Sequence, residues 1–529
     1  MDAGPPLAVT IARDGLVVSA AYLASRLLGY LRVVVIGTTF GAGPELDSFF
    51  AAFRIPDLIF QLVAAGAVAS ALVPLVSGLQ ATGDSARAWR IVATIANLML
   101  GAVAALAAVA FVLAPTLVPL ITPGFDAGQL ARTVDLTRIM LVGPILLTLG
   151  AVATAGLNGS RRFAASAVAP IIYNLAIIGG AVILGPSMGV TGLAVGVVAG
   201  SAGHLLIQLP PLARAGFRYS PRVDLADPEA RQALVLMAPR AIGLGATQLI
   251  FVVLTSLAST LGPGAISAYT IAFSLLQIPI GVVGIPLGIV LFPSLSGELA
   301  RGRTGTYLAL LGRGLRVGAW VMFPVAALGI VLSPQVVTLL LGYGRFGPEA
   351  IDLTAATLLA FLVGLPAHAA LDVLARAFYA RRDTVTPVIG AVVAVIVTIA
   401  LAIALVGSLG LPAVGLALSV GTWLEAGLLV AVLKRREAAF DVRGIGLLVL
   451  GAAGSAVLAA IAALAVVGML GGPVAGGGDK VAALVQAVLA TLAAGVVYLG
   501  ASVALRVPEL RTTVGTMLEI VRGRAGPRR

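Results

Sequence analysis

Residues 40–77 of this chain read FGAGPELDSFFAAFRIPDLIFQLVAAGAVASALVPLVS, and residues 261–296 read LGPGAISAYTIAFSLLQIPIGVVGIPLGIVLFPSLS. The two stretches share a Gly-X-Gly opening, a central Ala-Phe pair and a Pro-X-X-Ser ending. The offset of about 220 residues also relates Gly143-Pro144 to Gly364-Leu365-Pro366, Arg161-Arg162 to Arg381-Arg382, and Gly192-Leu193-Ala194 to Gly415-Leu416-Ala417. An internal repeat of this length predicts two halves of similar structure.

The composition of the chain indicates that both halves lie in a membrane. Hydrophobic residues make up 60% of the sequence and charged residues 11%, against roughly 45–50% and 25% in a soluble domain. Apolar runs of about 20 residues, the length that crosses a bilayer as a helix, recur throughout the chain. Water-soluble enzyme classes are therefore excluded.

The residues available for metal or redox chemistry are few. The chain has no cysteine, which excludes disulfides, iron–sulfur clusters and thiolate catalysis. Its two histidines, His204 and His368, are isolated and are most simply interpreted as polar residues in helix packing. We expect no enzyme activity, no metal site and no cofactor.

Turn residues and charges divide the chain into about fourteen predicted membrane helices. The fold class is therefore an all-α polytopic membrane protein, with two six-helix lobes in parallel repeat and two C-terminal helices. The predicted parts are a cytoplasmic N-terminus (1–15), an N-lobe (16–212), a cytoplasmic linker (213–231), a C-lobe (232–433), helices 13 and 14 (444–505) and a basic cytoplasmic tail (506–529).

The distribution of basic residues predicts the orientation. Most Lys and Arg lie in the N-terminal segment, the tail and the loops after every second helix, whereas the other loops hold only Arg132, Arg345 and Lys480. The positive-inside rule then places both termini in the cytoplasm. We expect the arginines of the tail to contact anionic membrane lipids and not nucleic acid.

Three arginines in the first two predicted helices form the candidate site. Arg26 and Arg32 have no acid on their own helix, while Arg54 lies on one helix face with Asp47 and Asp57. Three cations against two acids leave a positive charge that favours an anionic ligand. Arginine suits phosphate because its planar guanidinium donates two parallel hydrogen bonds. The candidate substrate-binding residues are Arg26, Arg32, Asp47 and Arg54, and the alternative is snorkelling at the interface with pairing between helices.

Two further charged residues are candidates with structural alternatives. Arg240 follows Pro239 early in the seventh helix, where it could line a cavity or snorkel. Glu425 is an acid deep in the second lobe and a candidate site for ion coupling, although pairing with a neighbouring helix is the simpler interpretation. Other membrane arginines have an acid on their own helix face, as in Asp135/Arg138 and Asp372/Arg376, and we expect ion pairs there.

Several motifs resemble the MurJ/MviN family of lipid II flippases, within the multidrug/oligosaccharidyl-lipid/polysaccharide exporter superfamily. They are Ser25-Arg-Leu-Leu-Gly-Tyr-Leu-Arg32, Phe40-Gly-Ala-Gly43, Asp47-Ser-Phe-Phe-Ala-Ala-Phe-Arg-Ile-Pro56, Pro293-Ser-Leu-Ser296 and Leu374-Ala-Arg-Ala-Phe-Tyr-Ala-Arg-Arg-Asp-Thr-Val-Thr-Pro387. The resemblance implies a fourteen-helix fold in the bacterial cytoplasmic membrane, with a V-shaped central cavity that contains Arg26, Arg32, Asp47 and Arg54. It also implies transport of undecaprenyl-diphosphate-linked peptidoglycan precursor from the inner to the outer leaflet, for cell-wall synthesis and cell shape.

The preferred mechanism is alternating access, in which the lipid diphosphate docks on the three arginines while its polyprenyl tail stays in the bilayer. The family's usual charged positions hold Phe60, Gln61, Ala65 and Ser274 here, so export of another polyprenyl-linked glycolipid is one alternative. A cation-coupled drug exporter of the same superfamily and a non-transporting scaffold for cell-wall proteins are the others. Cell-wall synthesis proteins are candidate partners.

Overall fold

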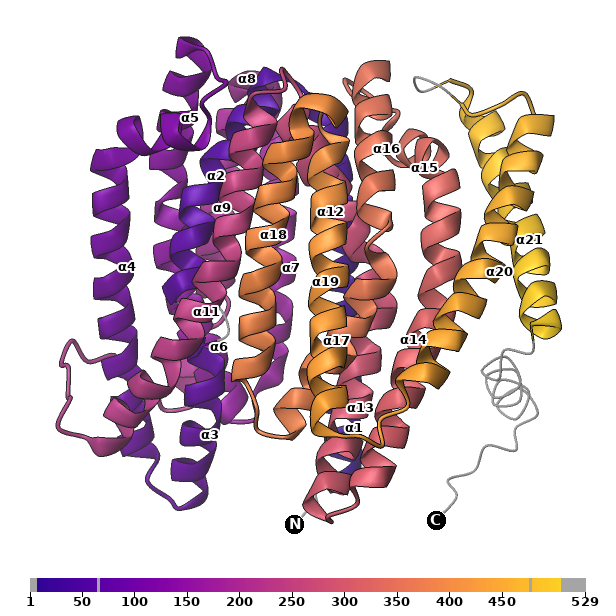
Figure 1. Ribbon diagram of the computed structural model, residues 1–529. Helices are drawn as coiled ribbons and strands as arrows, with labels where there is room; N and C mark the ends of the chain where they lie inside the picture. Colours follow the sequence, from indigo (N-terminus) through magenta and orange to yellow (C-terminus); the bar gives the residue numbers. More distant parts are fainter. Residues whose placement is uncertain (1–6, 64–66, 475–477, 506–529) are drawn as a thin grey trace. The chain divides into compact units, whose positions relative to one another are not determined.

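The computed structural model describes residues 7–63, 67–474 and 478–505, with side chains described from residue 20 onward except at 67, 236 and 238–247. Every regular element in these residues is a helix (Figure 1). The prediction of an all-α fold is confirmed.

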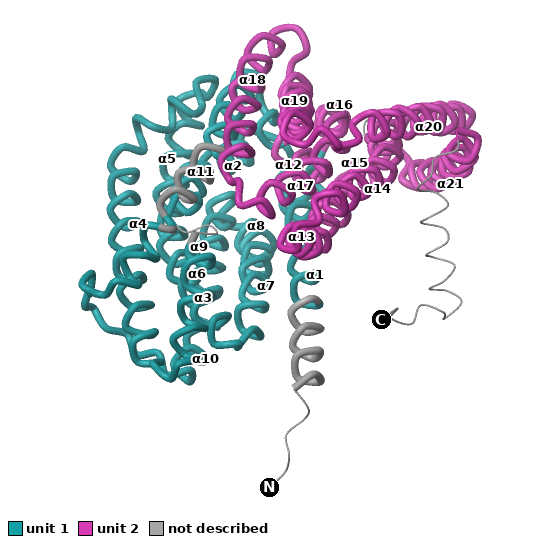
Figure 2. The backbone as a smooth tube through the Cα atoms, turned by 60° about the horizontal axis from the view of Figure 1, so that its bottom comes forward, with its two compact units in different colours: residues 1–267, 344–346 teal, residues 268–343, 347–529 magenta. Residues whose placement is uncertain are grey.

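The chain divides into two compact units, coloured separately in Figure 2. The first comprises residues 1–267 and 344–346, and the second comprises residues 268–343 and 347–529. Helices in the first unit are α1 (Leu7–Phe40), α2 (Pro44–Val63), α3 (Ala67–Ala81), α4 (Ser85–Ile121), α5 (Ala127–Met140), α6 (Val142–Gly159), α7 (Phe163–Gly179), the π-turn η1 (Gly180–Leu184), α8 (Gly185–Met188), α9 (Val190–Leu206), α10 (Leu209–Arg214) and α11 (Pro228–Ser259). Helix α12 (Ala265–Pro279) begins in the first unit and ends in the second. The further elements of the second unit are the short π-helix η2 (Ile280–Gly284), α13 (Ile285–Ala300), α14 (Thr304–Val331), α15 (Ser333–Leu341), α16 (Pro348–Leu362), α17 (Leu365–Ala380), α18 (Val385–Leu409), α19 (Pro412–Arg436), α20 (Val442–Met469) and α21 (Lys480–Ala504).

The number of membrane spans is close to the expected fourteen. In the described residues, twelve helices are long and apolar enough to cross a membrane, or thirteen if α16 and α17 count as one span. That pair is bent by 45° at Gly364-Leu365-Pro366, because a proline near the start of a helix leaves the preceding turn without a continuous hydrogen-bond ladder. Among the residues of α11 whose side chains are described, the segment Gln248–Ser259 qualifies as a shorter apolar helix.

Helix α11 packs in the first unit, although the sequence suggested that it opens the second lobe. Its Thr255 hydroxyl accepts a hydrogen bond from the Arg54 Nε at 2.9 Å, and its Ser259 hydroxyl accepts one from the Gly124 amide at 3.2 Å. The polar segment 213–231, which the sequence predicts as a cytoplasmic linker, lies within the first compact unit, which extends to residue 267. Polarity marks a loop, but only packing decides which side of a boundary a helix joins.

Backbone angles follow the sequence repeat. Left-handed residues recur at the offset of about 220 residues, as Gly41 (φ 72°) and Gly262 (96°), Arg161 (57°) and Arg382 (60°), and Gly189 (57°) and Gly410 (61°). The two arginines each follow the cap residue of a helix, α6 and α17 respectively, where a left-handed residue commonly ends a helix. The turns of the two halves therefore match even where their side chains differ.

The connection between α10 and α11 is held along the side of α4. The Trp89 indole donates a hydrogen bond to the Ala215 carbonyl at 3.1 Å, and the Asn97 amide donates one to the Ser220 carbonyl at 2.7 Å. The Arg87 guanidinium donates two parallel hydrogen bonds to the Asp227 carboxylate, at 2.8 and 3.0 Å. These hydrogen bonds from Arg87 lower the pKa of Asp227.

We expect Arg87→Ala to release this connection. Asp227 would lose its charged partner, and the segment between Ala215 and Asp227 would open more often, since local opening sets exposure to proteases. Limited trypsin digestion of the purified protein should cleave this segment severalfold faster than in the unmutated chain. Arg90→Ala, a change to another exposed arginine of α4, serves as the control, and equal cleavage rates in both variants would contradict the assignment.

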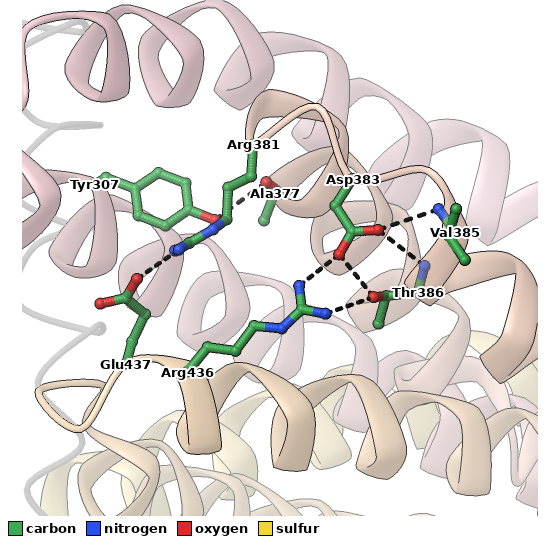
Figure 3. Close-up of polar contacts among 8 residues, drawn as sticks. All are labelled: Tyr307, Ala377, Arg381, Asp383, Val385, Thr386, Arg436 and Glu437. Atoms are coloured by element: carbon green, nitrogen blue, oxygen red, sulfur yellow. Dashed lines mark hydrogen bonds and ion pairs between the residues drawn. The ribbon is translucent and has the colours of Figure 1, made fainter.

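In the second unit, two ion pairs join the α17–α18 loop to the end of α19 (Figure 3). Arg381 pairs with Glu437, and Arg436 pairs with Asp383. The Thr386 hydroxyl and amide also donate to the Asp383 carboxylate, at 2.6 and 2.9 Å. Burial alone would raise the pKa of Asp383, but the hydrogen bonds from Thr386 and the Arg436 charge together lower it to about 2.

The lowered pKa of Asp383 predicts an acid-dependent loss of stability. Its contribution is complete above the pKa of an unfolded aspartate, about 4, and disappears as the pH falls to about 2. The thermal unfolding midpoint of the purified protein should therefore fall between pH 4 and pH 2 by a larger amount than in Asp383→Asn. Glu349→Gln, at an exposed acid of α16, should keep the full pH dependence. A pH dependence in Asp383→Asn equal to that of the unmutated chain would refute the prediction.

Within the second unit, the last helix, α21, is held by two side-chain hydrogen bonds to α15 and α14. The Gln335 amide of α15 donates a hydrogen bond to the Gln486 carbonyl oxygen of α21 at 2.8 Å. The Tyr498 hydroxyl of α21 donates to the Trp320 carbonyl of α14 at 2.6 Å. In apolar surroundings such hydrogen bonds between helices fix the register of neighbouring helices.

Candidate functional site

The first unit contains a cavity of about 480 Å³, within the range of small-molecule sites. Its wall comes from α1, α2, α3, α5, α6, α7 and α9. The polar side chains in the wall are Arg32, Asp57, Thr154, Ser166, Tyr173 and His204, and the larger apolar ones are Phe53, Phe60, Val68, Met140, Leu147 and Val197. A mostly apolar wall with few polar groups is typical of a site that orients a ligand.

Arg32 is the cation of this cavity. Its guanidinium carbon lies 6.0 Å from the centre of the Tyr173 ring, at the edge of the range for a cation–π contact. In the part of the chain that the structure describes, the guanidinium makes no ion pair. A partly desolvated arginine without a carboxylate partner favours an anionic ligand.

Close helix packing holds Tyr173 in this position. A side chain added at Gly200 of α9 would meet the Tyr173 carbonyl at 2.8 Å, and one added at Gly196 would meet the Gly180 Cα at 2.9 Å. The glycines of α9 therefore allow α7 to approach closely, because the small residues lie four apart on one helix face. The packing fixes the helix that carries the ring beside Arg32.

Arg26 and Arg54 lie outside the cavity wall. The Arg26 Nε donates a hydrogen bond to the Tyr22 hydroxyl at 3.0 Å, and its guanidinium lies 5.2 Å from the Tyr22 ring centre. Arg54 donates to the Thr255 hydroxyl at 2.9 Å and lies 5.9 Å from the Phe251 ring centre. The sequence grouped three arginines in one site, but the structure brings one of them to the cavity.

Asp47 is placed away from the cavity. Its side chain is 1% exposed, and its carboxylate accepts hydrogen bonds from the Gly264 amide (2.6 Å), the Ser267 amide (2.7 Å) and the Ser267 hydroxyl (2.6 Å). These amides belong to the first turn of α12, whose N–H groups lack partners within the helix. Asp47 of α2 thus caps a helix that lies far away in sequence.

Asp57, the second acid on the same face of α2, lines the cavity. Its two carboxylate oxygens accept weak hydrogen bonds from Gln61 and Gln248, each at 3.5 Å. Arg54 lies near enough for its charge to act on Asp57. The three charged residues that share one face of α2 therefore have different surroundings. Asp47 caps α12, Arg54 donates a hydrogen bond to α11, and Asp57 lines the cavity.

The cavity also contains His204, which sequence reasoning interpreted as a packing residue. The ring lies against Gly150 of α6, where an added side chain would meet the His204 Nδ1 at 2.5 Å. The buried amide of Gln208 lies beside the same ring nitrogen at 3.4 Å. The spacing of His204 and Gln208 places them on one helix face, but only the position of α6 shows that this face meets a cavity.

The two remaining candidates lie elsewhere. The side chain of Arg240 is outside the described residues. Glu425 of α19 is partly buried, with its Cγ 3.5 Å from the place that a side chain on Gly390 would occupy. The expected ion pair between Asp372 and Arg376 is present at 3.1 Å.

Comparisons with known proteins agree with one another. The family model described as "Lipid II flippase MurJ" matches residues 36–472. The chain is 32% identical over 431 residues to the lipid II flippase MurJ of Burkholderia cenocepacia, covering 80% of this chain and 83% of that protein. It is 33% identical over 433 residues to the probable lipid II flippase MurJ of Rhizobium meliloti, covering 79% of this chain and 80% of that protein.

Two solved structures show the same fold. A structure described as lipid II flippase MurJ in the inward closed conformation matches with a TM-score of 0.77 at 21% identity, over 93% of this chain and 99% of that one. An inward-facing multidrug resistance transporter of the MATE family matches with a TM-score of 0.65 at 16% identity, over 79% of this chain and 95% of that one.

Proposed function

Because this chain belongs to the lipid II flippase MurJ family, we propose that it moves lipid II from the inner to the outer leaflet of the bacterial cytoplasmic membrane. Lipid II is the undecaprenyl-diphosphate-linked precursor of peptidoglycan, so the transport serves cell-wall synthesis. Both termini then lie in the cytoplasm, in agreement with the positive-inside rule. The family assignment favours this substrate over the drug-exporter and scaffold alternatives.

The observation that carries the proposed site is the guanidinium of Arg32, which faces a cavity without a carboxylate partner among the described residues. A diphosphate would supply the missing negative charge, and the fork of the guanidinium matches two phosphate oxygens. The neighbouring Tyr173 ring and the apolar wall would exclude water and so strengthen this contact. Arg32 is therefore the primary phosphate ligand in our proposal.

The other candidate residues take different parts in the proposal. Arg26 on α1 and Arg54 on α2 contact the diphosphate before or after it binds to Arg32. Asp47 supports the site by capping α12. Arg240 is a candidate second cation, and Glu425 is a candidate site for a coupling ion.

We further propose that transport proceeds by alternating access. Two relatives of the same fold are described as inward closed and inward-facing, which supports more than one conformation for this architecture. The polyprenyl tail would remain in the bilayer while the headgroup crosses, because moving the tail through a polar path would cost about 0.8 kcal/mol for each CH₂ group. Cell-wall synthesis proteins that use the exported precursor are the proposed partners.

The proposed function is tested in bacterial cells depleted of their own lipid II flippase. Cells that express this chain should regain growth, and lipid II should become accessible in the outer leaflet to a lipid II-cleaving enzyme added outside. The same cells with an empty vector provide the baseline. If the chain reaches the membrane but leaves lipid II protected from the enzyme, the proposed substrate is wrong.

A further inference from the structure

A chain of hydrogen bonds runs along one side of the cavity. The Thr154 hydroxyl of α6 donates to the Gln208 carbonyl oxygen at 2.8 Å. The Gln208 amide nitrogen donates to the carbonyls of His204 (2.8 Å) and Gly150 (3.3 Å), and it lies 3.4 Å from the His204 Nδ1. Because Gln208 is fully buried, these contacts fix the orientation of its amide group.

This orientation favours one tautomer of His204. The Gln208 amide nitrogen cannot accept a hydrogen bond, so a proton on the His204 Nδ1, 3.4 Å away, would have no acceptor there. A neutral imidazole carries one proton on its two nitrogens, and a proton absent from Nδ1 must be on Nε2. Thr154 and Gln208 therefore make the His204 Nε2 a hydrogen-bond donor.

The Nε2 donor has room for a ligand. Gly150 and Gln208 occupy the ring edge that carries Nδ1, and His204 belongs to the cavity wall. Among the described residues, no side chain or carbonyl accepts a hydrogen bond from Nε2. The atom is also absent from the group of fully buried polar atoms that lack a partner. The Nε2 therefore keeps some accessible surface, and the cavity is the open space that His204 lines.

The cavity holds more than a diphosphate. Its volume of about 480 Å³ is many times the roughly 30 Å³ that one water molecule occupies in the liquid, so two phosphate groups would fill only part of it. Arg32 provides a cation for phosphate, whereas neutral His204 provides an uncharged donor that suits an uncharged oxygen. A lipid whose diphosphate continues into a sugar presents both kinds of acceptor.

We propose that His204 is a specificity-determining residue, whose Nε2 donates a hydrogen bond to an uncharged oxygen of the sugar and peptide headgroup beyond the diphosphate. Thr154 and Gln208 are positioning residues that set its tautomer. The inference rests on the proposed function. It adds that the cavity recognises the headgroup of the lipid in addition to its diphosphate. It separates recognition of phosphate by Arg32 from recognition of the headgroup by His204.

The test compares two lipids with the same tail and the same diphosphate. Full-length protein in lipid nanodiscs is titrated with lipid II and with undecaprenyl diphosphate, which lacks the sugar and peptide, and affinities are measured by native mass spectrometry. His204→Ala should weaken lipid II binding about tenfold, the effect of leaving one hydrogen-bonding group unpaired, and leave undecaprenyl diphosphate binding unchanged. Arg32→Ala should weaken the binding of both lipids.

Further variants distinguish positioning from general damage. Thr154→Val should reproduce the selective loss of lipid II affinity, and Thr154→Ser, which keeps the hydroxyl, should restore it. His368→Ala, a change to the other histidine of the chain, should leave both affinities unchanged. Thermal unfolding of each variant identifies any that fail to fold.

The outcomes separate this inference from the proposed function. Equal weakening of both lipids by His204→Ala, or no weakening of either, would overturn the role of His204 while Arg32→Ala still supported the phosphate site. Failure of the unmutated protein to bind lipid II would instead count against the proposed function. A selective loss in His204→Ala and Thr154→Val, with rescue by Thr154→Ser, would establish the inference.

Discussion

Replacement of Arg32 by alanine is expected to abolish the ability of this chain to support growth of cells depleted of their lipid II flippase. The variant removes the cation of the cavity wall, and a diphosphate would then have no cationic partner there while the acid Asp57 remained. Loss of a hydrogen bond to a charged group costs about 1.5–3 kcal/mol, which corresponds to a loss in affinity of about 10- to 100-fold. The measurement is colony formation together with the fraction of lipid II accessible from outside the cells.

Two matched variants show whether charge or geometry is needed. Arg32→Lys keeps the charge but loses the planar fork, so it should retain partial transport. Arg132→Ala removes an exposed arginine of α5 and should behave like the unmutated chain. Normal growth and normal lipid II exposure in Arg32→Ala, at equal protein levels in the membrane, would eliminate Arg32 as the phosphate ligand.

Replacement of Asp47 by alanine is expected to give the largest loss of stability. The Gly264 amide and the amide and hydroxyl of Ser267, at the start of α12, would lose their hydrogen-bond acceptor. These groups would stay buried, since Asp47 itself is only 1% exposed. Leaving buried polar groups unpaired costs about 1–3 kcal/mol for each, so we expect a loss of at least about 3 kcal/mol. The thermal unfolding midpoint of the detergent-purified protein reports this change.

The substitutions around Asp47 separate a structural role from substrate binding. Asp47→Asn keeps one carbonyl acceptor and should lose less stability than Asp47→Ala. Glu45→Ala removes an acid from the same turn of α2 and should change stability by only a few tenths of a kcal/mol. If Asp47→Ala unfolds at the temperature of the unmutated protein but fails to transport lipid II, then Asp47 acts on the substrate after all.

The sequence predicted the fold well because the relevant signals are local or repeated. Apolar runs long enough to cross a bilayer require helices, since the bilayer offers no partners for an open backbone. The repeat predicted two related halves, and the same offset appears in the left-handed residues Arg161 and Arg382. The bend between α16 and α17, in contrast, was not predicted, although Gly364 and Pro366 lie at it.

The candidate site was only partly predictable, because its geometry depends on residues that are distant in the chain. Asp47 looks like a membrane charge that needs a ligand, and its partners at Gly264 and Ser267 are 217 and 220 residues away. His204 looks like a packing residue until Gly150 of another helix is placed against its ring. Arg32 could be chosen because the predicted first membrane helix, residues 16–40, has no acid to neutralise it, which is a property of the sequence itself.

The paired left-handed turns after α6 and α17 are what duplication and fusion of an ancestral six-helix gene would leave behind. After such an event, the turns remain under constraint because each one sets the direction of the next helix, whereas the polar side chains are free to diverge. In the present chain the first unit carries Arg32 and His204 in the wall of its cavity, and the second carries the Asp372–Arg376 pair. Substrate recognition could thus evolve in one copy without rebuilding the architecture that both copies share.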